Sequence, residues 1–160
     1  MRVIVLFSTK CGNTQKVADE IASELNCESI RITKNKPEKV VELINYDLVV
    51  VGSGIRFGEP YDDIVNYLKT INLTTTKKFA LFVTWGGAAI ANQVVFSILE
   101  KILESKNQTV FEDFFSCYGK WKILRRGHPN TEDLKAARIW AQNLISKFSC
   151  ARVSILGVLC

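Results

Sequence analysis

Short unbroken apolar runs alternate along the chain with segments whose apolar residues recur every three or four positions. A run of this kind, rich in β-branched and aromatic residues, predicts a strand buried on both faces, as in a parallel sheet. The predicted strands are Arg2–Phe7, Ser29–Thr33, Asp47–Ser53, Lys78–Thr84 and Thr109–Cys117.

The segments between these runs have the spacing of amphipathic helices. The predicted helices are Val17–Leu25, Pro37–Ile44, Tyr61–Ile71, Ile90–Lys106 and Asp133–Phe148. Strictly alternating strands and helices predict an α/β fold, a doubly wound five-stranded parallel sheet with helices on both faces. Ligands of such sheets bind beyond the carboxyl ends of the strands. We therefore expect the chemistry in the loops that follow Phe7, Ser53 and Thr84.

The composition fits one globular domain over residues 1–160, in which 149–160 is an apolar tail without an assigned role. Hydrophobic residues make up 48% of the 160 residues and charged residues 23%, which excludes disorder. No apolar run has the length of a membrane span or the form of a signal peptide. The 5 cysteines are scattered without CxxC spacing, which favours reduced thiols in the cytoplasm over disulfides or a metal site.

The net charge of +5 is dispersed except for one cluster before the last predicted helix. The cluster consists of Lys120, Lys122, Arg125 and Arg126. It is either a solvated loop or a docking patch for an acidic redox partner protein. No recognition motif accompanies the charge, so we expect no nucleic-acid binding.

The loop after the first strand is short, rich in hydroxyls and ends at a helix N-terminus. Its residues are Ser8, Thr9, Lys10, Cys11, Gly12, Asn13 and Thr14. Free backbone N–H groups and the helix dipole favour an anion there, although Asn13 or Thr14 could instead only cap the helix. Neither the GxxxxGK[ST] nor the GxGxxG pattern is present.

This segment, followed by QKVADEIA, resembles the phosphate loop of the flavodoxin family, which usually ends in Thr-Gly-Asn-Thr. The resemblance covers nearly the whole chain. It implies non-covalent FMN, with its phosphate in this loop and its ring between the next two loops, and low-potential electron transfer between redox partners. Cys11 stands where the family usually has Thr, and a thiol is a weaker donor than a hydroxyl.

The loop after the third strand is rich in glycine. The residues predicted to bind the cofactor are Ser53, Gly54, Ile55, Arg56, Phe57 and Gly58. Phe57-Gly58-Glu59 resembles the family's apolar–Gly–acid pattern. The resemblance implies that Phe57 lies against the ring and that the Gly58 peptide flips to accept a hydrogen bond from flavin N5–H. Arg56 either favours the anionic reduced flavin or points to solvent.

The loop after the fourth strand contributes the last predicted cofactor-binding residues. They are Thr84, Trp85, Gly86, Gly87 and Ala88. By resemblance, backbone N–H groups of this loop hold the pyrimidine edge. The positions of the family's outer aromatic are small here, which leaves one flavin face open. An open face supports the alternative of an FMN-dependent oxidoreductase, either an NAD(P)H:quinone reductase or a protoporphyrinogen-oxidase-like enzyme. We predict no catalytic side chain and no metal.

Overall fold

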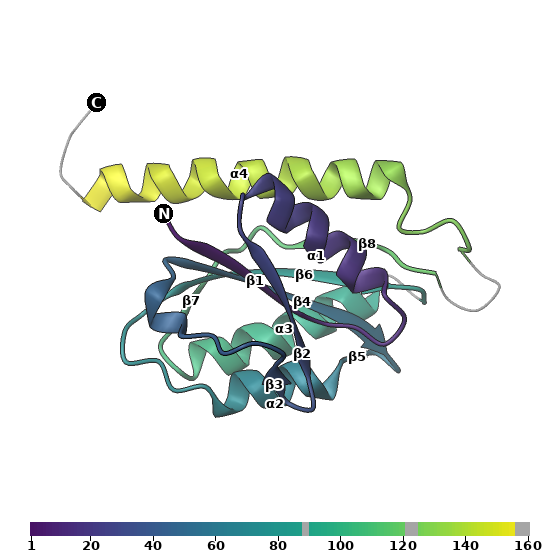
Figure 1. The fold of residues 1–160 in the computed structure, drawn as a ribbon, viewed down its shortest axis with the longest axis horizontal. Helices are drawn as coiled ribbons and strands as arrows, with labels where there is room; N and C mark the ends of the chain where they lie inside the picture. Colours follow the sequence, from purple (N-terminus) through teal and green to yellow (C-terminus); the bar gives the residue numbers. More distant parts are fainter. Residues whose placement is uncertain (88–89, 121–124, 156–160) are drawn as a thin grey trace.

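The computed structural model describes residues 1–87, 90–120 and 125–155 (Figure 1). A parallel sheet lies between two pairs of helices. Its strands are β1 (Val3–Ser8), β2 (Glu28–Thr33), β4 (Leu48–Arg56), β6 (Lys78–Trp85), β7 (Thr109–Val110) and β8 (Phe115–Tyr118). Two short strands, β3 (Lys36–Pro37) and β5 (Glu59–Pro60), pair antiparallel to β2 and β4.

The sheet order confirms the doubly wound topology. From one edge it is β2-β1-β4-β6, and both β7 and β8 pair with β6. The chain passes from β1 outward to β2 and then crosses back to β4 on the other side of β1. The switch point therefore lies between β1 and β4, where doubly wound sheets bind ligands.

Alternation along β1 explains the two layers of the core. Val3, Val5 and Phe7 face the helices α1 (Asn13–Glu24) and α4 (Thr131–Ile155). Ile4 and Leu6 face α2 (Asp62–Thr70) and α3 (Ile90–Glu104) on the other side. Successive strand residues point to opposite faces, so a strand apolar at every position is covered by helices on both faces.

The predicted helix Pro37–Ile44 is wrong. Lys34 and Asn35 have φ values of 50° and 64°, which is the backbone of a tight two-residue hairpin turn. The turn pairs Pro37 with Ile32 as β3, and only a 3-10 turn, η1 (Leu43–Asn45), follows. Because the chain reverses at Asn35, it cannot begin a helix at Pro37.

The last predicted strand is divided. Phe111 N–H still donates to Phe79 O at 2.8 Å, but the chain then leaves the sheet until Phe115. The carbonyl of Asp113 accepts a hydrogen bond from Trp140 Nε1 at 2.9 Å. The contact draws this segment toward α4, so β7 and β8 are separate strands.

The last helix is longer than predicted. α4 runs from Thr131 to Ile155 and so includes the first part of the stretch 149–160. Residues 156–160 lie outside the described part of the chain.

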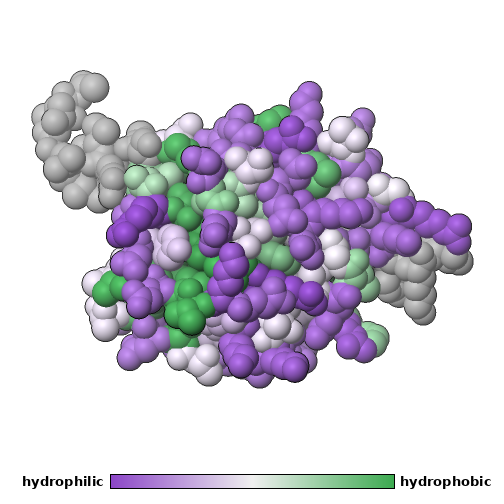
Figure 2. Space-filling model, in the orientation of Figure 1, coloured by the Kyte–Doolittle hydropathy of each residue, from purple (hydrophilic) through white to green (hydrophobic). Residues whose placement is uncertain are grey.

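A cavity of about 840 Å³ lies beside the segment that replaces the predicted helix. Leu43, Tyr67 and Ile71 contribute to its walls. Figure 2 shows hydrophobic side chains gathered on this side of the molecule, at the left of the view around η1. The cavity shares no lining residue with the loop after β1, so it is separate from the candidate site.

Candidate functional site

The loop between β1 and α1 presents backbone N–H groups without helical partners. Gly12 is the N-cap of α1 at φ 80°, a left-handed conformation that favours glycine. Its N–H donates to Thr9 Oγ1 at 3.0 Å, and the first helical bond joins Lys16 N–H to Gly12 O at 3.2 Å. No side chain caps α1, and its first turn holds no acidic residue. The loop can therefore accept an anion.

Two hydrogen bonds fix this loop to the ends of other strands. The hydroxyls of Thr14 and Thr84, at the end of β6, lie 2.8 Å apart in a buried contact. Asn13 Nδ2 donates to the carbonyl of Lys120, just beyond β8, at 2.9 Å. The loops after β1, β6 and β8 thus meet at one end of the sheet, as the strand order predicts.

A cavity of about 60 Å³ opens where these loops meet. Nine of the predicted residues line it: Thr9, Cys11, Asn13, Thr14, Gly54, Ile55, Thr84, Trp85 and Gly86. Eight further residues that were predicted to bind the cofactor lie in the described ranges but do not line the cavity: Ser8, Lys10, Gly12, Ser53, Arg56, Phe57, Gly58 and Gly87. Ala88 lies outside the described residues.

The glycine-rich loop after Ser53 is mostly a hairpin. β4 continues to Arg56, which pairs with Glu59 of β5. Phe57 and Gly58 form the turn with φ values of 53° and 85°. The Phe57 ring is 93% exposed, with the Arg56 guanidinium 5.2 Å from its centroid. Gly58 already has a left-handed backbone, so a side chain there would strain the hairpin before any peptide flip.

Tyr61 is a cavity residue that sequence reasoning missed. A Cβ on Gly54 would lie 2.4 Å from Tyr61 Cε2, so this glycine makes room for the ring. Tyr61 N–H donates to Ser53 Oγ at 3.0 Å. Burial, and secondarily Cys11, raises the pKa of Tyr61, so its phenol remains a hydrogen-bond donor at neutral pH. The sequence feature that could have indicated Tyr61 is an aromatic residue at the start of a predicted helix, shortly after Gly54 of the preceding loop.

Gly119 and Lys120 also line the cavity. Gly119 directly follows β8, the last strand. In the sequence, the positive charge of the loop that begins there suggests only a role as a docking patch. Ligands of doubly wound sheets bind beyond the carboxyl ends of the strands, and this holds for the loop after β8 as well. Both residues could therefore have been predicted from the sequence.

Trp85 is packed, not presented as a free stacking surface. It is 8% exposed, and its ring centroid lies 4.7 Å from that of Tyr118. The Arg125 guanidinium lies over both rings, 4.9 Å from Trp85 and 3.4 Å from Tyr118. His128 contacts the outer edge of Tyr118 and pairs with Asp133.

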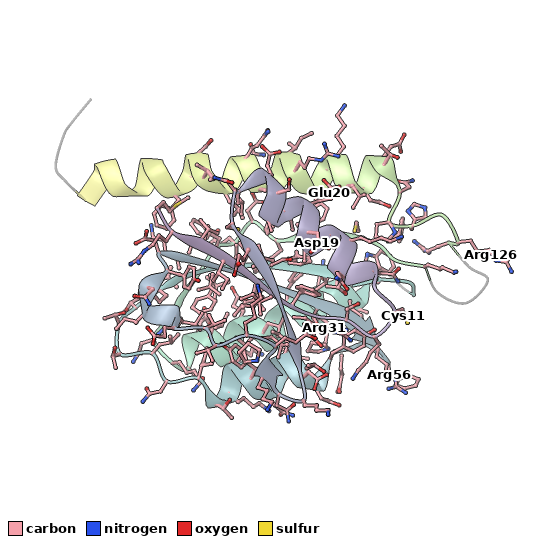
Figure 3. The ribbon with its side chains drawn as sticks, in the orientation of Figure 1. Cys11, Asp19, Glu20, Arg31, Arg56 and Arg126 are labelled. Atoms are coloured by element: carbon pink, nitrogen blue, oxygen red, sulfur yellow. The ribbon has the colours of Figure 1, made fainter. Side chains whose placement is uncertain are left out.

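The basic cluster divides in the structure. Arg125 is half-buried in its aromatic stack, whereas Lys120 and Arg126 are exposed. Figure 3 shows Arg126, Arg56 and Cys11 at the same end of the molecule. Lys122 lies outside the described residues. The charge of Lys10 is paired with Asp63 at 3.2 Å.

Within the described residues, no group of three or more His, Cys, Asp or Glu side chains could hold a metal ion. No helix in the described ranges combines the length and apolarity needed to cross a bilayer. Among the described cysteines, Cys11, Cys27 and Cys117 are free thiols.

Two proteins match the chain over nearly its whole length. An uncharacterized protein of Methanocaldococcus jannaschii is 33% identical over 153 residues, 91% of this chain and 99% of that protein. The flavodoxin-like domain-containing protein BilS of Clostridioides difficile is 32% identical over 179 residues, 93% of this chain and 99% of that protein. Protoporphyrinogen IX dehydrogenase [quinone] of Escherichia coli matches at 34% over only 71 residues, 43% of this chain and 39% of that protein.

Solved structures have the same fold. Flavodoxin 1 of Bacillus cereus superposes with a TM-score of 0.70 at 21% identity, covering 91% of this chain and 98% of that one. A flavoprotein of Lactobacillus acidophilus in complex with FMN superposes with a TM-score of 0.58 at 20% identity, covering 72% and 91%. The flavodoxin domain model matches residues 4–126. The chain therefore belongs to the flavodoxin domain family.

Proposed function

We propose that the chain binds FMN without a covalent bond and carries low-potential electrons between redox partners. The observation that supports this best is the uncapped start of α1, where Gly12 leaves room and no acid opposes an anion. A phosphate dianion would accept from the free N–H groups and gain from the helix dipole. FMN is the specific choice because the L. acidophilus protein of the same fold is an FMN complex.

The donor set at the cavity fits the phosphate end of FMN. Thr9 Oγ1 accepts from Gly12 and still has its own proton to donate. Ser8 Oγ does not line the cavity, but it is buried at the start of the loop and has no hydrogen-bond partner in the described chain. The cavity of about 60 Å³ has room for a phosphate-sized group. The ring would extend beyond it toward Phe57, whose 93% exposure would then fall.

Bound FMN would supply redox chemistry in one- and two-electron steps. The residues of the chain would bind and orient it without donating or removing protons. We propose that acidic partner proteins dock near Lys120, Lys122 and Arg126, supported by the net charge of +5 and by the exposure of Lys120 and Arg126. Free thiols support a reducing, cytoplasmic setting.

A second candidate is an FMN-dependent quinone or protoporphyrinogen oxidoreductase. The partial match to protoporphyrinogen IX dehydrogenase [quinone] favours it. The stack of Trp85 on Tyr118 and Arg125 also favours it, because a ring held there is not free to cover the flavin.

The phosphate loop is tested by Gly12→Asp. A carboxylate at this position would face the phosphate and abolish FMN binding, since like charges in contact repel strongly. Gly12→Asn is the matched control, because it places a side chain of the same size at the same left-handed φ of 80° without the negative charge. FMN fluorescence titration measures both, and normal affinity in Gly12→Asp would remove this loop from the proposal.

Anaerobic titration separates the two candidates. A carrier keeps its oxidised flavin absorbance when NADH or NADPH is added. Its flavin is reduced only by a protein electron donor or by dithionite. An oxidoreductase is bleached by the pyridine nucleotide or by protoporphyrinogen and regains its colour when a quinone is added. Bleaching at catalytic rates would replace the carrier proposal with the second candidate.

A further inference from the structure

One basic side chain reaches the phosphate loop from the neighbouring strand. Arg31 lies in β2, in register with Phe7 of β1 just before the loop. Its Nη2 donates to the carbonyl of Thr9 at 3.0 Å. Thr9 lines the cavity, and its hydroxyl holds the N–H of Gly12. Figure 3 labels Arg31 on β2 and Cys11 on this loop. The guanidinium is thus one hydrogen bond from the backbone that surrounds the anion site.

The positive charge of Arg31 has no acidic partner in the described chain. No described carboxylate oxygen lies within 4.0 Å of its nitrogens. Its Nε is buried and has no hydrogen-bond acceptor there. The acid on the facing side of α1, Asp19, instead accepts from Ser29 Oγ at 2.6 Å. A partly buried charge without a counter-charge is costly, so an anion bound beside this loop would supply the counter-charge that the described chain does not.

The other cation of the loop is already neutralised. Lys10 pairs with Asp63 at 3.2 Å, and its side chain is 53% exposed. The start of α1 contributes only about half a positive charge, whereas a phosphate monoester carries nearly two negative charges at neutral pH. Arg31 therefore adds a full, unpaired charge whose side chain is hydrogen-bonded to this loop.

We propose that Arg31 is a positioning residue that makes the site selective for the phosphorylated flavin. It acts through the backbone of Thr9, fixing the loop and supplying the charge that balances the phosphate. The proposal rests on FMN binding as proposed above. Its consequence is that the preference for FMN over riboflavin, which lacks the phosphate, depends on Arg31.

The test compares FMN and riboflavin affinities by fluorescence titration of the full chain. Arg31→Gln should weaken FMN binding about tenfold and leave riboflavin affinity unchanged. Arg31→Lys should keep part of the preference, because the charge remains while the fork of donors is lost. Arg138→Gln is the matched control, since it removes a guanidinium paired with Glu20 at 2.9 Å, on α4 and outside the cavity lining.

A pH series adds a readout that a packing defect would not alter. The preference of the wild-type chain for FMN should grow as pH rises through the second phosphate pKa, near about 6, and this growth should be smaller in Arg31→Gln. Equal weakening of both flavins in Arg31→Gln, with no rescue by lysine, would overturn the proposal and leave Arg31 a structural residue. Failure of the wild-type chain to bind FMN would instead overturn the proposed function itself.

Discussion

Gly119→Ala tests whether the contact between the phosphate loop and the end of β8 supports cofactor binding. A Cβ at this position would lie 2.7 Å from Asn13 Nδ2 and 3.1 Å from its Cβ and Cγ. The amide must therefore move, and its 2.9 Å hydrogen bond to Lys120 O is lost. A net loss of about 0.5–1.5 kcal/mol corresponds to a two- to tenfold weaker affinity for FMN, at about 1.4 kcal/mol per tenfold.

A double-mutant cycle identifies the cause of this loss. Asn13→Ala removes the amide that the new methyl group would displace, so Gly119→Ala should cost little more in that background. Gly127→Ala, which adds a methyl group in open space, controls for the glycine substitution itself. FMN fluorescence titration gives the affinities, and urea unfolding shows that each variant is folded. If the two losses simply add, the displacement of Asn13 is not the cause and the reasoning is refuted.

Three further perturbations act on stability, each measured by urea unfolding of the cofactor-free chain. Gly52→Ala should destabilise by at least about 1–3 kcal/mol, because its Cβ would lie 2.0 Å from the ring of fully buried Phe82; an unchanged midpoint would contradict the close packing of β4 on this ring. Gly58→Val should cost about 1–2 kcal/mol, because φ is 85° in the hairpin turn, and a neutral result would mean that the turn relaxes freely. Burial raises the pKa of the Cys117 thiol to about 12. Stability from the neutral thiol is therefore present below the unfolded pKa, about 8.5, and lost as pH rises toward 12; Cys117→Ala should flatten that decline.

The sequence predicted the core strands well because their pattern follows from burial alone. β1 is buried at every position, and β4 is buried from Leu48 to Gly54. A strand is buried at every position only when helices cover both faces of its sheet, and its sequence is then an unbroken apolar run. The positions of the three candidate loops then followed from the parallel topology, without any knowledge of side-chain contacts.

Local backbone conformation and long-range contacts were not predictable in the same way. The helix expected from Pro37 fails because Asn35 takes a left-handed φ of 64°, which apolar spacing does not encode. Tyr61 reaches the cavity only because Gly54 lacks a side chain beneath its ring. Arg31 lies in a strand that was predicted, but its contact with Thr9 depends on strand register.

The bond from Asn13 to Lys120 joins positions 107 residues apart, and this separation has a consequence for biosynthesis. The loop that begins the anion site leaves the ribosome well before Lys120, which anchors it. Its fixed geometry requires β8, which pairs with β6 only after residue 118 has been made. A nascent chain halted after β6 therefore has the contact between Thr14 and Thr84 but lacks the bond from Asn13 to Lys120. Loading of the proposed FMN should therefore wait until β8 has paired and the sheet is complete.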